Sequence, residues 1–84
     1  MSAEIKATVR SFLNETFMFR GAVDQVADDA SLIKAGILDS VGVLTLISFL
    51  EEKFEVQVSD DEVEPENLES VDAITAFVQK KTGA

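Results

Sequence analysis

Apolar residues recur every three or four positions along three long segments of the chain, which is the spacing of one face of an α-helix. The first segment follows Ser2, the second follows Asp39 and the third follows Ser70. The second face is broader than a surface helix needs, so we expect this helix to be central to the core. The positions on these faces are Ile5, Val9, Phe12, Leu13 and Thr16; then Val43 or Leu44, Ile47, Leu50 and Phe54, widened by Val41, Leu46 and Phe49; and finally Val71, Ile74, Phe77 and Val78.

Capping residues set the predicted ends of these helices. Ser2, Asp39 and Ser70 can each accept a hydrogen bond from an otherwise unpaired amide of the first helical turn. The first helix should end near Phe19–Gly21, where glycine can adopt the left-handed conformation of a C-terminal cap. The second helix should run to about Phe54.

The remaining segments are shorter or less regular. Ser59–Glu62 matches a capping box and predicts a short third helix that breaks before Pro65. Glu55–Val58 could form a β-strand, but a lone strand would have nothing to pair with. Polar residues and glycine interrupt the pattern over Gly21–Leu38, which indicates a long structured loop with one helical turn at Ser31–Ala35.

Together these elements predict an all-α fold. We expect a four-helix bundle of three longer helices and one short third helix, with a long loop between the first and second helices. The length of 84 residues suits a single domain that spans residues 1–84.

Charge is distributed unevenly along the chain, whose net charge is −9. The segment from Asp39 to Asp72 holds eleven acids and one base, and so carries −10, while the remaining residues together carry +1. Such a surface repels nucleic acid and favours basic protein partners. A charge run of this kind is also common on a solvated helix face that has no partner.

The residue types that are missing exclude several classes of protein. The chain has no cysteine and no histidine, and so lacks the commonest nucleophile–base pairs and transition-metal ligands. We therefore expect no catalytic residue, no enzymatic activity of its own and no metal site. The acids of Asp60–Glu64 lack the alternating ligands and the turn glycine of a calcium-binding EF-hand loop.

The sequence shows no signal-peptide pattern and no apolar run long enough to cross a bilayer. We expect a cytoplasmic monomer that does not insert into membranes.

One serine lies where a phosphate would be stabilised. Asp39 as N-cap places Ser40 in the first turn of the second predicted helix, at the end of the long loop. Unpaired amides and the helix dipole make that position electropositive. Ordinary helix capping by an Asp-Ser pair would explain the same two residues without any modification.

The surrounding motifs resemble those of the acyl and peptidyl carrier proteins. Leu38-Asp39-Ser40-Val41 resembles their Asp-Ser-Leu attachment motif, and Leu50-Glu51-Glu52-Lys53-Phe54 resembles the Leu-Glu-Glu-x-Phe that closes their second helix. Leu32-Ile33-x-x-Gly36-Ile37-Leu38 resembles the loop that enters the motif. Pro65-Glu66-Asn67-Leu68-x-Ser70-Val71 also resembles carrier domains, and the likeness extends over roughly Ala3–Phe77.

This resemblance implies a covalent cofactor and a set of partners. A phosphopantetheinyl transferase would move 4'-phosphopantetheine from coenzyme A onto Ser40, and the thiol of the arm would hold acyl or aminoacyl groups as thioesters. Asp39 and Val41 beside the serine, with Glu51 and Glu52 further along the helix, would face partner enzymes. Those partners would be the transferase, an acyl- or aminoacyl-loading ligase, and acyltransferase or ketosynthase-type enzymes.

Two positions depart from the pattern of many fatty-acid carriers, which have an acid two residues after the serine and a glutamate five residues after it. Here those positions are Gly42 and Thr45. They indicate a carrier of a specialised lipid, polyketide or aminoacyl pathway. Gly42 could permit close approach of the arm or of a partner, while Val43 and Phe49 could either add apolar surface there or fill the core.

The alternative is an acidic regulatory or mimicry protein that binds a basic partner without being modified. In that case Ser40→Ala would leave function intact.

Overall fold

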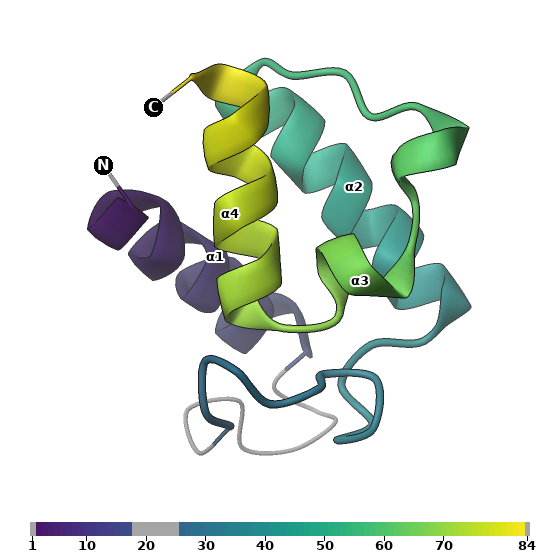
Figure 1. The fold of residues 1–84 in the computed structure, drawn as a ribbon. Helices are drawn as coiled ribbons and strands as arrows, with labels where there is room; N and C mark the ends of the chain where they lie inside the picture. The colour runs from purple at the N-terminus through teal and green to yellow at the C-terminus, as the bar shows by residue number, and fades with distance from the viewer. Residues whose placement is uncertain (1, 18–25, 84) are drawn as a thin grey trace.

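The computed structural model of the chain describes residues 2–17 and 26–83 (Figure 1). Four α-helices lie in this part of the chain, and a single 3-10 turn precedes the third of them. Their bounds are α1 Ser2–Phe17, α2 Ser40–Phe54, α3 Pro65–Leu68 and α4 Val71–Thr82, with the 3-10 turn η3 at Asp60–Glu62. The described residues hold no β-strand, and the prediction of an all-α four-helix bundle with a short third helix is confirmed.

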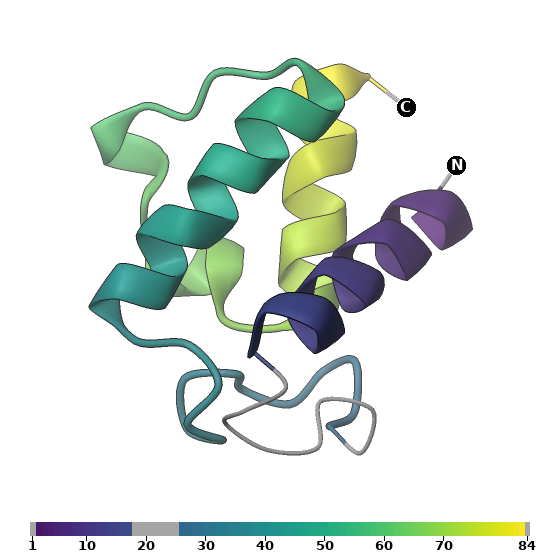
Figure 2. The same cartoon turned by 180° about the vertical axis from the view of Figure 1, so that it is seen from behind.

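Helix α4 is the element on which the other three helices pack. It lies between α1 and α2 in both views (Figures 1 and 2). Ser70 caps it, because the Ser70 side chain accepts a hydrogen bond from the amide of Ala73. The core around it consists of Ile5, Val9, Leu13, Phe17, Leu32, Ile37, Leu38, Leu46, Ile47, Leu50, Leu68, Val71, Ile74, Phe77 and Val78.

The helical spacing predicted most of this core, and α2 resolves the open choice between Val43 and Leu44. Val43 packs against the core, whereas Leu44 is 63% exposed. Val41, which was expected to widen the apolar face, is 68% exposed. Ser2 was predicted to cap α1 and is instead its first helical residue. The predicted end of this helix at Phe19–Gly21 lies outside the described residues.

The predicted capping box at Ser59 and the break before Pro65 are present, but the short α-helix lies after this break and not before it. The capping residues at Ser59 start only the 3-10 turn η3, and the α-helix begins at Pro65. The side-chain amide of Asn67 donates to the carbonyl of Glu62 (2.9 Å), a bond that a continuing helix would make with a backbone amide. Proline favours the first position of a helix, since the amide hydrogen that it lacks has no partner there, and it disfavours helical geometry in Glu64 before it.

The segment from Val26 to Asp39 crosses one end of the bundle and leads into α2 (Figure 1). The amide of Leu32 donates to the carbonyl of Glu69 (2.6 Å), and the carbonyl of Leu32 accepts from Ile37 and Leu38. The predicted helical turn is present, because the amide of Ala35 donates to the carbonyl of Ser31 (3.0 Å). These bonds hold the loop against the start of α4 and fix the direction in which the chain enters α2.

Ion pairs tie the same loop to α1 and α4. Nζ of Lys6 lies 3.3 Å from Oδ2 of Asp28 and 3.0 Å from Oδ1 of Asp72. Nε of Arg10 donates to Oδ1 of Asp28 (2.7 Å). The Arg10 guanidinium lowers the pKa of Asp28, and Asp72 and Asp28 raise the pKa of Lys6. The amide of Asp72 also donates to the carbonyl of Asp28 (2.9 Å), so backbone and side-chain contacts join these three elements.

Four phenylalanine rings form a continuous row of contacts between α1 and α2. Phe12 of α1 lies parallel to Phe49 of α2, with ring centroids 3.9 Å apart. Phe17 meets Phe12 edge-on, and Phe54 meets Phe49 edge-on. Phe54, which the helical spacing placed on the core face of α2, is only half-buried and contributes through these ring contacts.

We expect Phe49→Ala to lower the free energy of unfolding by about 2–3 kcal/mol, which is less than for a fully buried phenylalanine because the ring is half-buried. The substitution removes the parallel contact with Phe12 and the edge contact with Phe54 together. Urea denaturation would measure the change, with Phe49→Leu as a control that keeps apolar volume without a ring. An unchanged urea midpoint in Phe49→Ala would show that the stack does not hold α1 against α2.

Candidate functional site

Ser40 is the first residue of α2, and its position depends on Asp39. The Asp39 side chain accepts a hydrogen bond from the amide of Gly42 (2.7 Å), and its carbonyl accepts from Val43 (2.8 Å). This is the predicted N-cap. Ser40 is exposed, and the first turn of α2 contains no acidic residue. A negative group on the serine would therefore meet the positive end of the helix dipole.

Gly42 allows α1 to pack closely against α2. The sequence had instead suggested that it permits the close approach of the arm or of a partner. It is buried, and a Cβ built on it would lie 3.2 Å from Cε1 of Phe17 and 3.3 Å from Oδ1 of Asp39. The Phe17 ring thus occupies the space that a side chain at position 42 would need. Any side chain at this position would require the ring or Asp39 to shift.

An apolar groove of about 770 Å³ opens beside Ser40. A smaller hollow of about 100 Å³ shares Ile33, Val43 and Val63 with it and reaches Leu68 of α3. The groove is thus built from the entering loop, from α2 and from the segment between η3 and α3. Its lining residues are Ile33, Gly36, Leu38, Asp39, Ser40, Val43, Leu44 and Val63.

The other residues that the sequence singled out do not all lie at the serine. Val41 follows Ser40 and is exposed, while Glu51 and Glu52 lie about three turns away, or about 16 Å along the helix axis. Glu52 is exposed, but Glu51 accepts a hydrogen bond from the amide of Val58 (2.9 Å) and holds the chain that leaves α2.

Sequence reasoning missed Val63, which lies 23 residues after Ser40 and lines both hollows. It was not placed near the serine because its neighbours were expected to be helical. A visible signal was its position as an apolar residue between Glu62 and Glu64.

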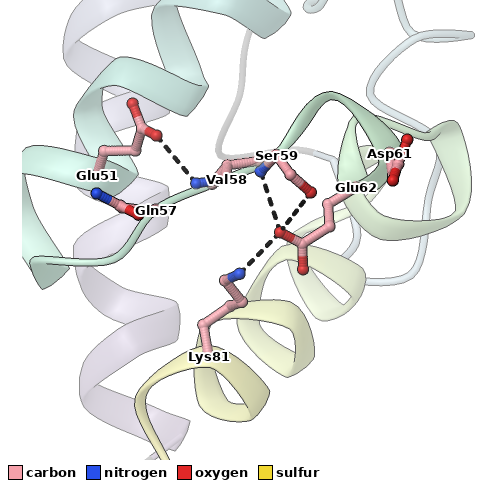
Figure 3. A pocket seen from close by; sticks show the side chains of 7 residues that line it. All are labelled: Glu51, Gln57, Val58, Ser59, Asp61, Glu62 and Lys81. Carbon is pink, nitrogen blue, oxygen red and sulfur yellow. Dashed lines mark hydrogen bonds and ion pairs between the residues drawn. The ribbon is translucent and has the colours of Figure 1, made fainter.

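A second, polar pocket of about 730 Å³ lies at the other end of α2, where Glu51 and Glu62 are found (Figure 3). Oε1 of Glu62 accepts from Nζ of Lys81 (2.7 Å) and from both the amide and the hydroxyl of Ser59 (3.1 Å each). The Lys81 ammonium and then the Ser59 amide lower the pKa of Glu62 to about 2. These bonds join η3 to the last turn of α4.

In the described part of the chain, no group of three His, Cys, Asp or Glu side chains is arranged to hold a metal ion. None of the helices described there combines the length and the apolar character needed to cross a membrane.

An exposed serine behind an aspartate cap, in a first helical turn without acidic residues and next to an apolar groove, suits a protein that carries a group on a covalent handle. Comparison with known proteins agrees with this class. The family described as "Phosphopantetheine attachment site" matches residues 3–78.

Curated relatives are named acyl carrier protein. The one from Akkermansia muciniphila is 35% identical over 60 residues, which is 71% of this chain and 72% of the relative. Those from two strains of Buchnera aphidicola subsp. Acyrthosiphon pisum, Tuc7 and APS, are each 38% identical over 58 residues, which is 69% of this chain and 70% of each relative. The chain therefore belongs to the phosphopantetheine-attachment family of carrier proteins, with 4'-phosphopantetheine as a covalent cofactor.

We expect Gly42→Val to lower the free energy of unfolding by about 1–3 kcal/mol, because its branched side chain would overlap the Phe17 ring. Thermal and urea unfolding would measure the effect. Gly42→Ala is the matched control, since its gain in helix propensity of about 1 kcal/mol opposes the tight contacts of a lone Cβ with Phe17 and Asp39. A Gly42→Val protein as stable as the wild type would contradict the close packing of Phe17 on α2.

A second prediction concerns the stability of the folded protein at acid pH. The pKa of Glu62 is below its usual 4.5 in the folded protein, so its ion pair contributes stability above about pH 4.5 that is lost as the pH falls towards 2. Over this range we expect the urea midpoint of the wild type to fall more steeply than that of Glu62→Gln. Asp61→Asn is the control, because it removes an acid from the same turn and leaves the Lys81–Glu62 contact in place. Equal slopes for wild type and Glu62→Gln would be the contrary result.

Proposed function

We propose that Ser40 is the attachment site, and that this chain holds acyl or aminoacyl groups as thioesters and delivers them to partner enzymes. The observation that carries the proposal is the exposed serine at the start of α2, behind the Asp39 cap and on the rim of the apolar groove. The family match over residues 3–78 supports it, because the matched region includes this serine.

The chain's own residues prepare the serine for modification. Asp39 ends the loop and starts α2, which leaves the Ser40 hydroxyl at the surface. Loading replaces the hydroxyl hydrogen: the Ser40 oxygen forms a phosphate ester with the phosphorus of the phosphopantetheine half of coenzyme A. The pyrophosphate bond to the other half breaks, adenosine 3',5'-bisphosphate leaves, and a proton is released. The arm supplies a thiol that a chain without cysteine lacks.

The groove gives the attached group a place to rest. A ligand tethered at Ser40 has a high effective concentration at a groove that Ser40 itself lines, so weak apolar contacts suffice to hold it there. Ile33, Val43 and Val63 would make these contacts, since they line both the groove and its inner hollow. An apolar acyl group fits such a lining.

We further propose that the chain serves a specialised lipid, polyketide or aminoacyl pathway. Thr45 supports this best, because it is exposed on α2 at a position where many fatty-acid carriers have glutamate. Its hydroxyl donates to the carbonyl of Val41 (3.1 Å) and so faces its own helix. The partners would be a phosphopantetheinyl transferase, a loading ligase, and acyltransferase or ketosynthase-type enzymes, and the chain itself would catalyse no step.

Intact mass measured after incubation with coenzyme A and a broad-specificity phosphopantetheinyl transferase tests the site. We expect the wild type to gain one phosphopantetheine and Ser40→Ala to gain none. Ser48→Ala is the matched control, because it removes an exposed hydroxyl from the same helix and should be loaded fully.

Loading of Ser40→Ala would place the attachment elsewhere. No loading of a folded wild type, with the transferase active on a control carrier, would favour an unmodified acidic protein that binds a basic partner.

A further inference from the structure

Lys34 is the only basic residue from position 26 to position 52, the part of the chain that forms the loop and most of α2. It lies in the helical turn of the loop and is exposed. Ile33 before it and Gly36 after it line the groove that Ser40 also lines. The backbone of Lys34 therefore lies at the edge of the groove that would receive a group tethered at Ser40.

Hydrogen bonds hold the backbone of this turn in place. The amide of Lys34 donates to the hydroxyl of Ser31 (3.1 Å), and the amide of Ala35 donates to the carbonyl of Ser31 (3.0 Å). Gly36 has a φ of 80° and closes the turn, because its amide donates to the carbonyl of Ile33 (3.1 Å). The long side chain of Lys34 thus starts from a fixed point, and its amine can sample only the space around this edge of the groove.

Within residues 2–17 and 26–83, no ion pair joins the amine of Lys34 to a carboxylate, in contrast to two other lysines of the chain. Nζ of Lys6 lies 3.0 Å from Oδ1 of Asp72. Nζ of Lys81 lies 2.7 Å from Oε1 of Glu62. An amine attacks a carbonyl carbon only after it has lost its proton, and a carboxylate partner opposes that loss. Lys34 is therefore better suited to act as a nucleophile than Lys6 or Lys81.

We propose that Lys34 is a site of self-acylation, at which its amine takes the acyl group from a thioester tethered at Ser40. This inference rests on the proposed function. The nitrogen of Lys34 attacks the carbonyl carbon and forms an amide, the carbon–sulfur bond breaks, and a proton passes from the nitrogen to the sulfur, which becomes a thiol again. The reaction needs no further reactant. Its product holds the cargo as a stable amide, so that this group is no longer available for delivery.

Tethering makes the reaction selective for Lys34. A thioester anchored at Ser40 meets an amine at the edge of the same groove at an effective concentration that a free thioester in solution does not reach. Lys53 is the comparison on α2. It is exposed in the last turn of the helix, about 20 Å from Ser40 along the axis, and it does not line the groove.

Loading with butyryl-coenzyme A and a broad-specificity phosphopantetheinyl transferase tests the site, because this places a butyryl thioester on Ser40 in one step. The purified product is kept at mildly alkaline pH and then treated with hydroxylamine, which removes butyryl groups held as thioesters and leaves those held as amides. The masses of the protein and of its peptides then locate what remains. We expect a butyryl amide on Lys34 that forms about tenfold faster than any on Lys53. Its rate should not depend on the protein concentration, because the transfer takes place within one chain.

Three variants serve as controls, and a thermal melt would verify that each is folded. Lys34→Arg keeps the charge and removes the nucleophile, so we expect it to be loaded and then to lose its butyryl group to hydroxylamine. Lys53→Arg is the matched control and should form the amide as the wild type does. Ser40→Ala, treated with the same reagents, should stay unacylated, because free butyryl-coenzyme A lacks the tether.

A loaded wild type from which hydroxylamine removes every butyryl group would overturn self-acylation and leave the proposed function standing. An amide on Lys34 of the Ser40→Ala variant would assign the reaction to free butyryl-coenzyme A, and a rate that rises with protein concentration would assign it to transfer between two chains. Either result overturns the proposal. A wild type that never gains butyryl-phosphopantetheine overturns both this inference and the proposed function.

Discussion

The attachment of the loop to the start of α4 is the constraint on which the rest of the structure depends. A long segment without regular secondary structure can lie against a core only if its backbone polar groups find partners. Here the Leu32 amide bonds to Glu69, the Asp72 amide bonds to Asp28, and the Leu32 side chain is fully buried. Lys6 and Arg10 then fasten Asp28 to α1. The loop therefore behaves as part of the bundle and delivers the chain to Asp39 in one direction.

The site follows from that constraint. Because the loop is fixed, Ile33 lines the groove beside Ser40, and the turn that precedes α3 adds Val63 to the same groove. The Phe12–Phe49 stack and the contact of Phe17 with Gly42 hold α2 against α1 from behind. Ser40 is thus an exposed residue at the end of a helix that is packed against the core, which suits the attachment proposed for it.

Sequence reasoning was reliable where the signal is local. The caps at Asp39 and Ser70 and the helical spacing of the core depend on residues a few positions apart, and the structure has them as predicted. It did not predict contacts over long separations. Nothing near Gly42 in the sequence indicates Phe17, and nothing near Glu62 indicates Lys81. The third α-helix was misplaced because a capping box can be satisfied by a single 3-10 turn. The bond from the Asn67 side chain to the carbonyl of Glu62, which follows this turn, cannot be read from the spacing of apolar residues.

The two ends of α2 also differ in what their side chains do, although the sequence treated both as surfaces for partners. At the far end Glu51 and Glu62 are engaged within the fold, by Val58 and by Lys81 respectively, which leaves Glu52 as the acid of the helix-closing motif with most freedom to meet a partner. At the near end the exposed Val41 and Leu44 are apolar, and the exposed carboxylate of Asp39 directly precedes the helix. Acidic side chains at the far end and apolar side chains at the near end therefore give the two ends of α2 different surface chemistry. A carrier that must meet several enzymes and leave each of them benefits from this separation, because steering speeds encounter without tightening the final contact.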